Sequence, residues 1–202
     1  LIPVEGGQLA AELPLSTEII KSIQNRRALL VAAFLHDIGK GRKEDHSIVG
    51  ARIARHLCPR MGLTAAETDL IAWLIEEHLT MSNVAQSRDI SDPKTVQDFA
   101  ARVQSPERLK LLFLLTVADI RAVGPGVWNG WKGQLLRTLY YETEPLLTGG
   151  HTQVERRERI GAAQQALRAA LSDWPAHEVD QFIDRHYPNY WLRIDTPAAV
   201  EH

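Results

Sequence analysis

The sequence predicts an all-α protein, and three observations carry the prediction. Apolar residues recur at intervals of three and four along most of the chain, which is the spacing of a half-buried helix. Helix start signals recur as well, with Ser, Thr or Asp placed before Pro or before a Glu three residues on. No pair of alternating segments suits neighbouring strands. With 202 residues, 45% of them hydrophobic, the chain has room for one full-sized domain of roughly 100–200 residues and a smaller appendage.

The first half of the chain predicts five helices, at 16–23, 25–37, 45–60, 64–79 and 82–86. Ser16 and Thr17 are expected to cap the first. The second is apolar nearly all round, so it should be buried, and the two glycines that follow it end it. Thr64 with Glu67 three residues on forms a capping box that opens the fourth helix.

The second half predicts helices at 92–103, 107–122, 131–144, 153–171 and 178–186. Pro93 and Pro106 each follow a capping residue and stand at the first helical position. Gly124-Pro125-Gly126 reads as a loop. The segment 187–194 is the only one that reads as extended, and we expect it to lead toward a following domain.

Gly149-Gly150 is the best candidate for a domain boundary. It divides the chain into a helical domain at 1–148 and a small helical extension at 149–202. The chain opens without Met, and we expect a fragment of a longer protein. Trp73 and Trp174 are interpreted as core residues. Trp128, Trp131 and Lys132 follow the Gly-Pro-Gly loop and are expected to pack at a helix start, or else to contact a ligand or partner.

Composition excludes several classes of protein. The formal net charge is −2, so no general positive field draws nucleic acid. The longest apolar run, at 28–35, is far shorter than the ~18 residues of a membrane span, and no signal peptide is visible. The single cysteine, Cys58, excludes an internal disulfide and is expected in the core. These features favour a cytoplasmic protein that binds neither nucleic acid nor membrane.

His36 and Asp37 stand together at the end of the buried second helix. A buried carboxylate is costly unless it is paired or bound to a cation, so the pair suggests a metal site. His46 opens the next helix, and a helix that starts after a tight glycine turn can return beside its predecessor. Each residue alone also fits a structural role, at a helix end or on the surface.

His78 and Asp119 extend the pattern. His78 ends a strongly apolar helix, and Asp119 lies inside one of the most apolar helices, where a cap is excluded by position. We expect His36, Asp37, His46, His78 and Asp119 to converge as ligands of a divalent metal, with Mn or Mg favoured and Fe, Co or Zn as alternatives. Lys40 and Arg121 lie near them in sequence and are expected to bind phosphate oxygens.

The order of these residues resembles that of the HD-domain metal-dependent phosphohydrolases. That resemblance implies an all-α HD-domain helical bundle with a small helical C-terminal extension. Members of the family begin the ligand set with another His upstream of the His-Asp pair, and residues 1–35 contain none. We therefore expect that ligand to lie outside this chain.

A narrower likeness extends from residue 10 to residue 150, on these segments: His36-Asp37-Ile38-Gly39-Lys40-Gly41-Arg42, Asp45-His46-Ser47, His78-Leu79-Thr80-Met81, Arg88-Asp89-Ile90, Leu115 to Arg121, Trp128 to Lys132 and Leu136 to Tyr141. They resemble the HD domain of the bacterial bifunctional uridylyltransferase/uridylyl-removing enzymes. The resemblance implies hydrolysis of uridylylated PII signalling protein with release of UMP. It also implies that glutamine is sensed by domains absent from this chain, as is the transferase.

By the same resemblance, the catalytic residues are Asp37, Lys40, His46 and Arg121. Two alternatives stay open. The chain could hydrolyse a nucleotide instead, although the Glu-Asp pair of alarmone hydrolases and the Gly-Tyr-Pro of cyclic-dinucleotide hydrolases are absent after His36-Asp37. It could also be a regulatory scaffold with an incomplete metal site.

Overall fold

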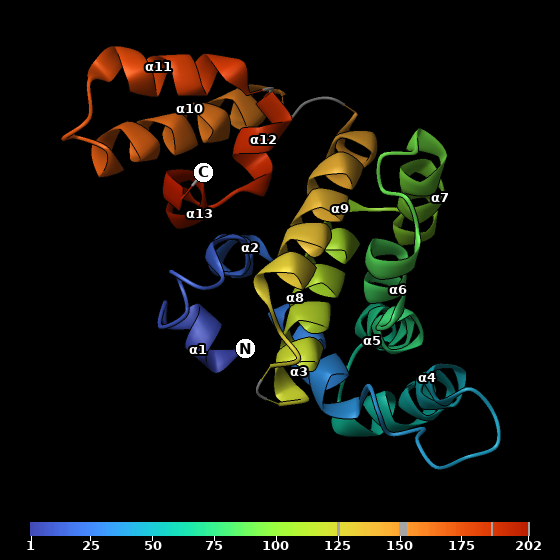
Figure 1. Ribbon diagram of the computed structural model, residues 1–202. Coiled ribbons are helices and arrows are strands. Elements are labelled where there is room, and N and C mark those ends of the chain that lie inside the picture. The colour runs from blue at the N-terminus through green and yellow to red at the C-terminus, as the bar shows by residue number, and fades with distance from the viewer. Residues whose placement is uncertain (125, 150–152, 187, 202) are drawn as a thin grey trace.

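The computed structural model describes residues 1–124, 126–149, 153–186 and 188–201, and the described residues form helices and no strand (Figure 1). The α-helices are α1 (Ile2–Glu5), α2 (Pro14–Ser22), α3 (Arg26–Leu35), α4 (His46–Leu57), α5 (Ala65–Glu77), α6 (Thr80–Ser87), α7 (Pro93–Val103), α8 (Pro106–Ala122), α9 (Gly130–Thr148), α10 (Gln153–Ala170), α11 (Ala176–Arg185), α12 (Pro188–Arg193) and α13 (Thr196–Glu201), with a 3-10 turn at Cys58–Met61. The predicted all-α class is confirmed.

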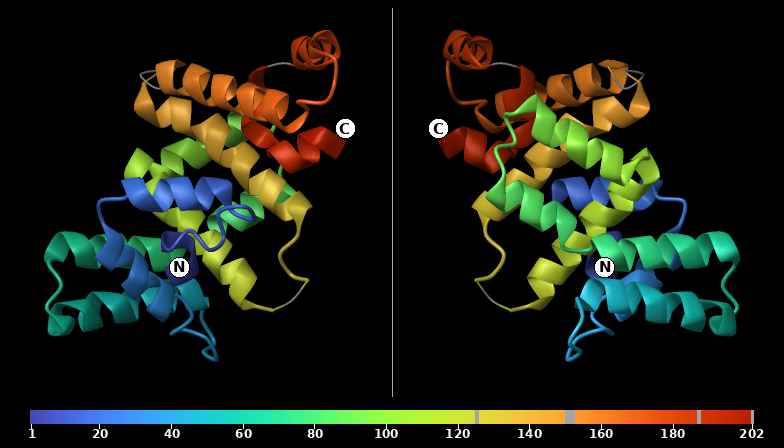
Figure 2. Two further views of the ribbon diagram at one scale, coloured as in Figure 1. Left: turned by 90° about the vertical axis from the view of Figure 1, so that its left-hand side faces the viewer. Right: turned by 90° about the vertical axis from the view of Figure 1, so that its right-hand side faces the viewer.

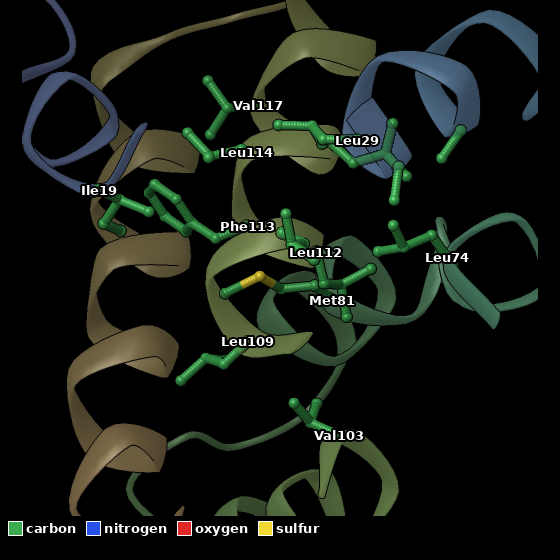
Figure 3. Close-up of a cluster of buried hydrophobic side chains, with 14 of the residues drawn as sticks. Ile19, Leu29, Leu74, Met81, Val103, Leu109, Leu112, Phe113, Leu114 and Val117 are labelled. Carbon is green, nitrogen blue, oxygen red and sulfur yellow. The ribbon is translucent and has the colours of Figure 1, made fainter. Parts of the chain in front are cut away.

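Helix α8 is the centre of the main domain. It contacts α2, α3, α5, α6, α7 and α9, so nearly its whole circumference is covered. Figure 3 shows Leu112 and Phe113 of α8 among Met81, Leu29 and Ile19, side chains from α6, α3 and α2. Each such side chain contributes about 1.5–3 kcal/mol by leaving water. This packing makes α8 a rigid support for the polar residues of its last turns.

Helices α4 and α5 pack closely and run antiparallel, because His46 at the start of α4 meets His78 at the end of α5. A methyl group added at Gly50 would lie 2.9 Å from Cγ2 of Ile75. The space beside Gly39 is smaller still, since its added methyl would lie 2.1 Å from the carbonyl oxygen of His46. These glycines let the turn after α3 and the start of α4 come together.

The C-terminal helices have a core of their own. Leu167, Val179, Ile183, Trp191 and Ala199 form this second cluster of buried side chains. Figure 2 shows α10–α13 at one end of the molecule and α3–α5 at the other. The two cores lie on either side of the predicted boundary at 148/149, which itself stays a prediction.

Ionic and packing contacts join the second unit to the first. Arg159 of α10 lies 2.9 Å from an oxygen of Glu18 on α2 and 3.4 Å from one of Glu144 on α9. Helix α12 also packs against α9. The extension is therefore docked on the main domain rather than held by the chain alone.

Several local predictions were wrong. Ser16 and Thr17 do not cap α2, because Pro14 already opens it and the Thr17 hydroxyl donates to the Leu13 carbonyl inside the helix. Trp174 is 58% exposed rather than in the core. Helix α9 runs past Glu144 to Thr148 with Pro145 inside it. In each case a short-range signal was read without the tertiary contacts that decide the outcome.

The expected extended segment at 187–194 was also wrong, because residues 188–193 form helix α12. Trp191 and Leu192 are buried there against α9 and α10, and this packing outweighs the aromatic-rich pattern that suggested a strand. Parts of three predictions fall outside the described residues: Pro125 of the loop, Gly150 of the boundary and Tyr187 of this segment.

Other predictions were confirmed. Thr64 and Glu67 form the capping box at the start of α5, and the first helical position of α7 and of α8 is proline. Cys58 is a buried free thiol, and Trp73 packs against the main core. Within the described residues, no helix combines the length and the apolar character needed to cross a membrane.

Candidate metal centre

Two histidines occupy equivalent positions at the ends of helices. The expectation that the first of these helices is buried all round was wrong, because α3 buries one face and leaves Phe34 83% exposed. His36 caps the C-terminus of α3 and His78 that of α5. Nδ1 of His36 lies 2.8 Å from the carbonyl oxygen of Ala33, and Nδ1 of His78 lies 2.7 Å from that of Ile75. A carbonyl can only accept, so each Nδ1 carries a proton, and Nε2 is the ring atom left to face the cluster. Metal-binding histidines are held in this way.

A third histidine reaches the same place from α4. Asp45 caps that helix by accepting from the backbone N–H of Ser47 at 2.8 Å, which fixes the position of His46 at its first turn. The ring centroids of His46 and His78 are 5.2 Å apart, and those of His36 and His78 are 5.3 Å apart. His78 therefore lies between the other two imidazoles.

Asp37 connects these side chains. Its Oδ2 lies 3.4 Å from Nε2 of His36 and 2.6 Å from Nζ of Lys40, and its Oδ1 lies 3.9 Å from Nε2 of His46. Among the described residues, Asp37, His46 and His78 each offer a ligand atom, and those atoms lie within 4.8 Å of one another. Such a grouping of carboxylate and imidazole fits a divalent cation.

Asp119 approaches from α8. Its Oδ1 lies 3.3 Å from Nε2 of His36, and this hydrogen bond holds the pKa of the Asp119 carboxyl below its usual range. The same bond raises the pKa of His36. Burial lowers the pKa of His78, which favours the neutral imidazole that a metal requires. The mid-helix carboxylate thus has the partner that its apolar surroundings demand.

Contacts link the five residues predicted as metal ligands, which come from four parts of the chain. Among the described residues, the ligand atoms of Asp37, His46 and His78 all lie within 4.8 Å of one another, and His36 and Asp119 lie beside this group. The contacts run from Asp119 to His36, then to His78 and His46, with Asp37 beside His36 and His46. Three neutral-capable imidazoles and two carboxylates are a donor set that suits Mn, Fe, Co or Zn, and carboxylates also suit Mg. The residues present fit a divalent metal.

The two basic residues predicted at the site are each paired. Lys40 contacts Asp37 directly, so its ammonium lies at the cluster. Arg121 lies two residues beyond Asp119, and its guanidinium is 2.9 Å from an oxygen of Glu12. Glu12 was not found from the sequence, since nothing in the segment before α2 marks it. Trp128 packs against the core as predicted, whereas Trp131 is 59% exposed.

A second interaction missed from the sequence supports His78. The neighbouring Glu77 is nearly buried, accepts from the Thr80 hydroxyl at 2.5 Å and pairs with Nε of Arg102 on α7 at 2.7 Å. This network fixes the turn between α5 and α6 that presents His78. A buried Glu beside a candidate ligand was the available signal, but its partner 25 positions away in sequence could only come from the fold.

The comparison with protein-family models decides the family. The HD domain model matches residues 4–122, a range that contains all five clustered residues. The chain belongs to the HD domain family. The matched range includes His36-Asp37, at the junction of α3 and the turn that follows it.

The narrower resemblance, to uridylyltransferase/uridylyl-removing enzymes, is also found among the curated relatives. Bifunctional uridylyltransferase/uridylyl-removing enzymes from Nitrobacter winogradskyi and Bradyrhizobium diazoefficiens are 60% and 58% identical to this chain over 193 residues. The match covers 95% of this chain and 21% of each relative, so the chain spans about a fifth of their length. No solved structure matches this HD domain.

Proposed function

We propose that this HD domain is a metal-dependent phosphodiester hydrolase that removes the uridylyl group from uridylylated PII signalling protein and releases UMP in the cytoplasm. The observation that carries the proposal is the convergence of Asp119, His36, His78, His46 and Asp37, with Lys40 beside them. The names of the relatives, which include a uridylyl-removing activity, support the choice of substrate.

By the family resemblance, His36, Asp37 and Asp119 would hold the metal together with a histidine outside this chain. Their neighbours His46 and His78 would hold a second ion or orient the substrate. Mn or Mg is the favoured ion. Such an ion, when bound, supplies positive charge to the phosphoryl oxygens and makes water a stronger nucleophile at neutral pH.

The residues of the chain have separate roles in this proposal. His36 and His78 are oriented by their backbone carbonyls before any ligand binds. Lys40 offers a point charge to a phosphate oxygen in exchange for its present contact with Asp37. Arg121 would do the same after leaving Glu12. By the family resemblance, the uridylyl group is attached to a tyrosine of PII. In the reaction, a water oxygen bonds to phosphorus, the bond to the tyrosyl oxygen breaks, and tyrosine takes the proton.

Regulation by glutamine would come from domains of the longer relatives. The domain described here would then be the hydrolytic part alone, and PII its protein partner. This division of labour rests on the resemblance and on the lengths of the relatives.

The test uses this chain and a version extended at its N-terminus by the corresponding segment of the Nitrobacter relative. Each is incubated with uridylylated PII and Mn, and release of UMP is followed by chromatography. We expect release that is abolished by chelation and by His36→Ala. Release of no UMP by the extended version would contradict the proposal, and metal bound without hydrolysis would favour the scaffold alternative.

A further inference from the structure

A polar groove along α6 leads away from the metal centre, and we propose that it holds the uracil nucleoside of the substrate. Asn83 and Arg88 would read the edge of the base. This inference rests on the proposed function and deepens it, because it names the part of the substrate that this surface recognises. Four features of the groove carry the inference: its position, its size, its unpaired side chains and their chemistry.

Sequence neighbours of His46 and His78 line the groove, although the two imidazoles themselves do not. The imidazoles form a row from His36 through His78 to His46. Asp45 and Ser47, which flank His46, line the groove, and so does Thr80, two residues after His78. A nucleotide whose phosphate lies at the imidazoles therefore has a hollow for its nucleoside at the His46 end of the site. The opposite end is occupied by Asp119.

One face of α6 forms the floor of the groove. Its residues follow the helical spacing of three and four: Thr80, Asn83, Val84, Ser87 and Arg88. The groove has a volume of about 450 Å³ and continues into a second hollow of about 220 Å³ beside Phe99 of α7. Sites for small molecules usually measure about 300–1,000 Å³, so a nucleoside has enough room.

Most polar side chains of the groove already form hydrogen bonds or ion pairs within the protein. The hydroxyl of Thr80 and the guanidinium of Arg102 both bind Glu77, and the hydroxyl of Ser87 donates to the backbone carbonyl of Asn83. The side-chain amide of Asn83 and the guanidinium of Arg88 differ, since neither has a hydrogen-bond or ionic partner among the described residues. Both are exposed and face one hollow.

These two groups match uracil. The base presents a carbonyl, an N–H and a second carbonyl along one edge, and a carboxamide both donates and accepts, so Asn83 can pair with two neighbouring positions. The amide alone would also fit cytosine after a half turn. Arg88 only donates, and therefore requires a carbonyl where cytosine carries an amino group. Together they favour uracil.

The first experiment separates base recognition from hydrolysis. The N-terminally extended protein is assayed with Mn on uridine 5′-(4-nitrophenyl phosphate), its cytidine analogue and bis(4-nitrophenyl) phosphate, which has no base. We expect Asn83→Ala and Arg88→Ala each to raise KM for the uridine substrate about tenfold, which is the loss of one hydrogen bond to a substrate. Hydrolysis of the base-free substrate should stay within twofold.

The matched control is Gln86→Ala. Gln86 is an exposed amide on the same helix, bonds the Ser82 carbonyl and does not line the groove. It should behave as the unmodified protein with all three substrates. Arg88→Ala should also reduce the preference for uridine over cytidine. Unchanged KM values in both groove variants, with all substrates hydrolysed, would overturn the inference and leave the proposed function standing.

A binding measurement covers the case in which no substrate is hydrolysed, which would count against the proposed function. Calorimetric titration with UMP and with CMP then tests the groove directly. Weaker UMP binding by about tenfold in Asn83→Ala and Arg88→Ala supports the inference. Equal UMP affinity in the unmodified protein and both variants, or no UMP binding at all, overturns it.

Discussion

Nε2 of His36 lies 3.3 Å from Oδ1 of Asp119, so the end of α3 is joined directly to the last turns of α8. Each residue supplies what the other lacks in a half-buried place, a donor for the carboxylate and an acceptor for the imidazole. The pair also places two candidate ligands side by side before any metal arrives. The first prediction follows from this dependence.

Replacing Asp119 with Asn should weaken Mn binding by about 100-fold, because a charged ligand is lost and Nε2 of His36 loses its carboxylate partner. The measurement is calorimetric titration with MnCl₂. Asp69→Asn is the matched control, since Asp69 is an exposed carboxylate on α5. Equal Mn affinity in Asp119→Asn and the unmodified protein would remove Asp119 from the metal site.

Gly39→Ala should destabilise the fold by at least about 2 kcal/mol, as overpacking against a backbone atom does. The added methyl would meet the His46 carbonyl, and relief requires the turn to separate from α4. Urea denaturation measures the stability, and Mn titration should show weaker binding as His46 moves from Asp37.

Gly41→Ala separates crowding from backbone strain. Gly41 has a φ of +82° and no neighbour within 4 Å of the added methyl, so only conformational strain of about 1–2 kcal/mol is expected. Metal binding should be retained in this variant. If both alanine variants lost equal stability and kept full Mn affinity, the close approach of Gly39 to α4 would have no role in the site.

Glu67 predicts a pH dependence of stability. Its bond to Arg27, together with those to Thr64, lowers its pKa from 4.5 to about 2 in the folded protein. A carboxyl with a depressed pKa stabilises the fold fully above its unfolded pKa, and the contribution disappears as the pH falls toward the folded value. The advantage of the unmodified protein over Glu67→Gln should therefore shrink between pH 4.5 and about 2.

Urea midpoints for both proteins between pH 7 and pH 3 provide the measurement. Glu76→Gln serves as the comparison, because Glu76 lies on the same helix and makes a longer contact with Arg55, at 3.6 Å. A constant difference between Glu67→Gln and the unmodified protein across this range would show that the Arg27 pair does not depend on ionisation.

Arg159→Met should loosen the C-terminal unit. The change removes the two ion pairs of Arg159, with Glu18 and Glu144, and leaves Glu144, only 13% exposed, without this cation. We expect a loss of about 1–3 kcal/mol and faster hydrogen exchange in α10 than in α8.

The matched control for that variant is Arg168→Met, which removes an exposed pair with Asp180 within the C-terminal unit. Its cost should stay below about 1 kcal/mol. Exchange in α10 that is equally slow in Arg159→Met and in the unmodified protein would mean that apolar packing alone docks the extension.

Much of the helical order could be predicted from local signals. Pro93 and Pro106 at first helical positions and the box of Thr64 with Glu67 are short-range chemistry, and the structure confirms them. The prediction of an extended segment around Trp191 was wrong. Burial against α9 and α10 decides the conformation there, and no neighbour in sequence specifies that burial.

The sequence indicated which residues form the candidate site, but not which of them contact one another. Asp119 stood out because a carboxylate inside an apolar helix needs a partner, and the pattern of histidines suggested one. Which residue it would contact depended on how α3 crosses α8. The contact between Arg121 and Glu12 was beyond prediction for the same reason, since Glu12 lies before α2 in a segment without a motif.

The hydrogen bonds of the His36 and His78 rings to the carbonyls of Ala33 and Ile75 have a structural consequence for ligand binding. These oxygens belong to the final turns of α3 and α5, so the direction of each Nε2 is set by how firmly its helix terminates. Fraying of either end by one turn would rotate an imidazole away from the cluster. An ion bound to both rings would oppose this fraying and stabilise the last turns of both helices.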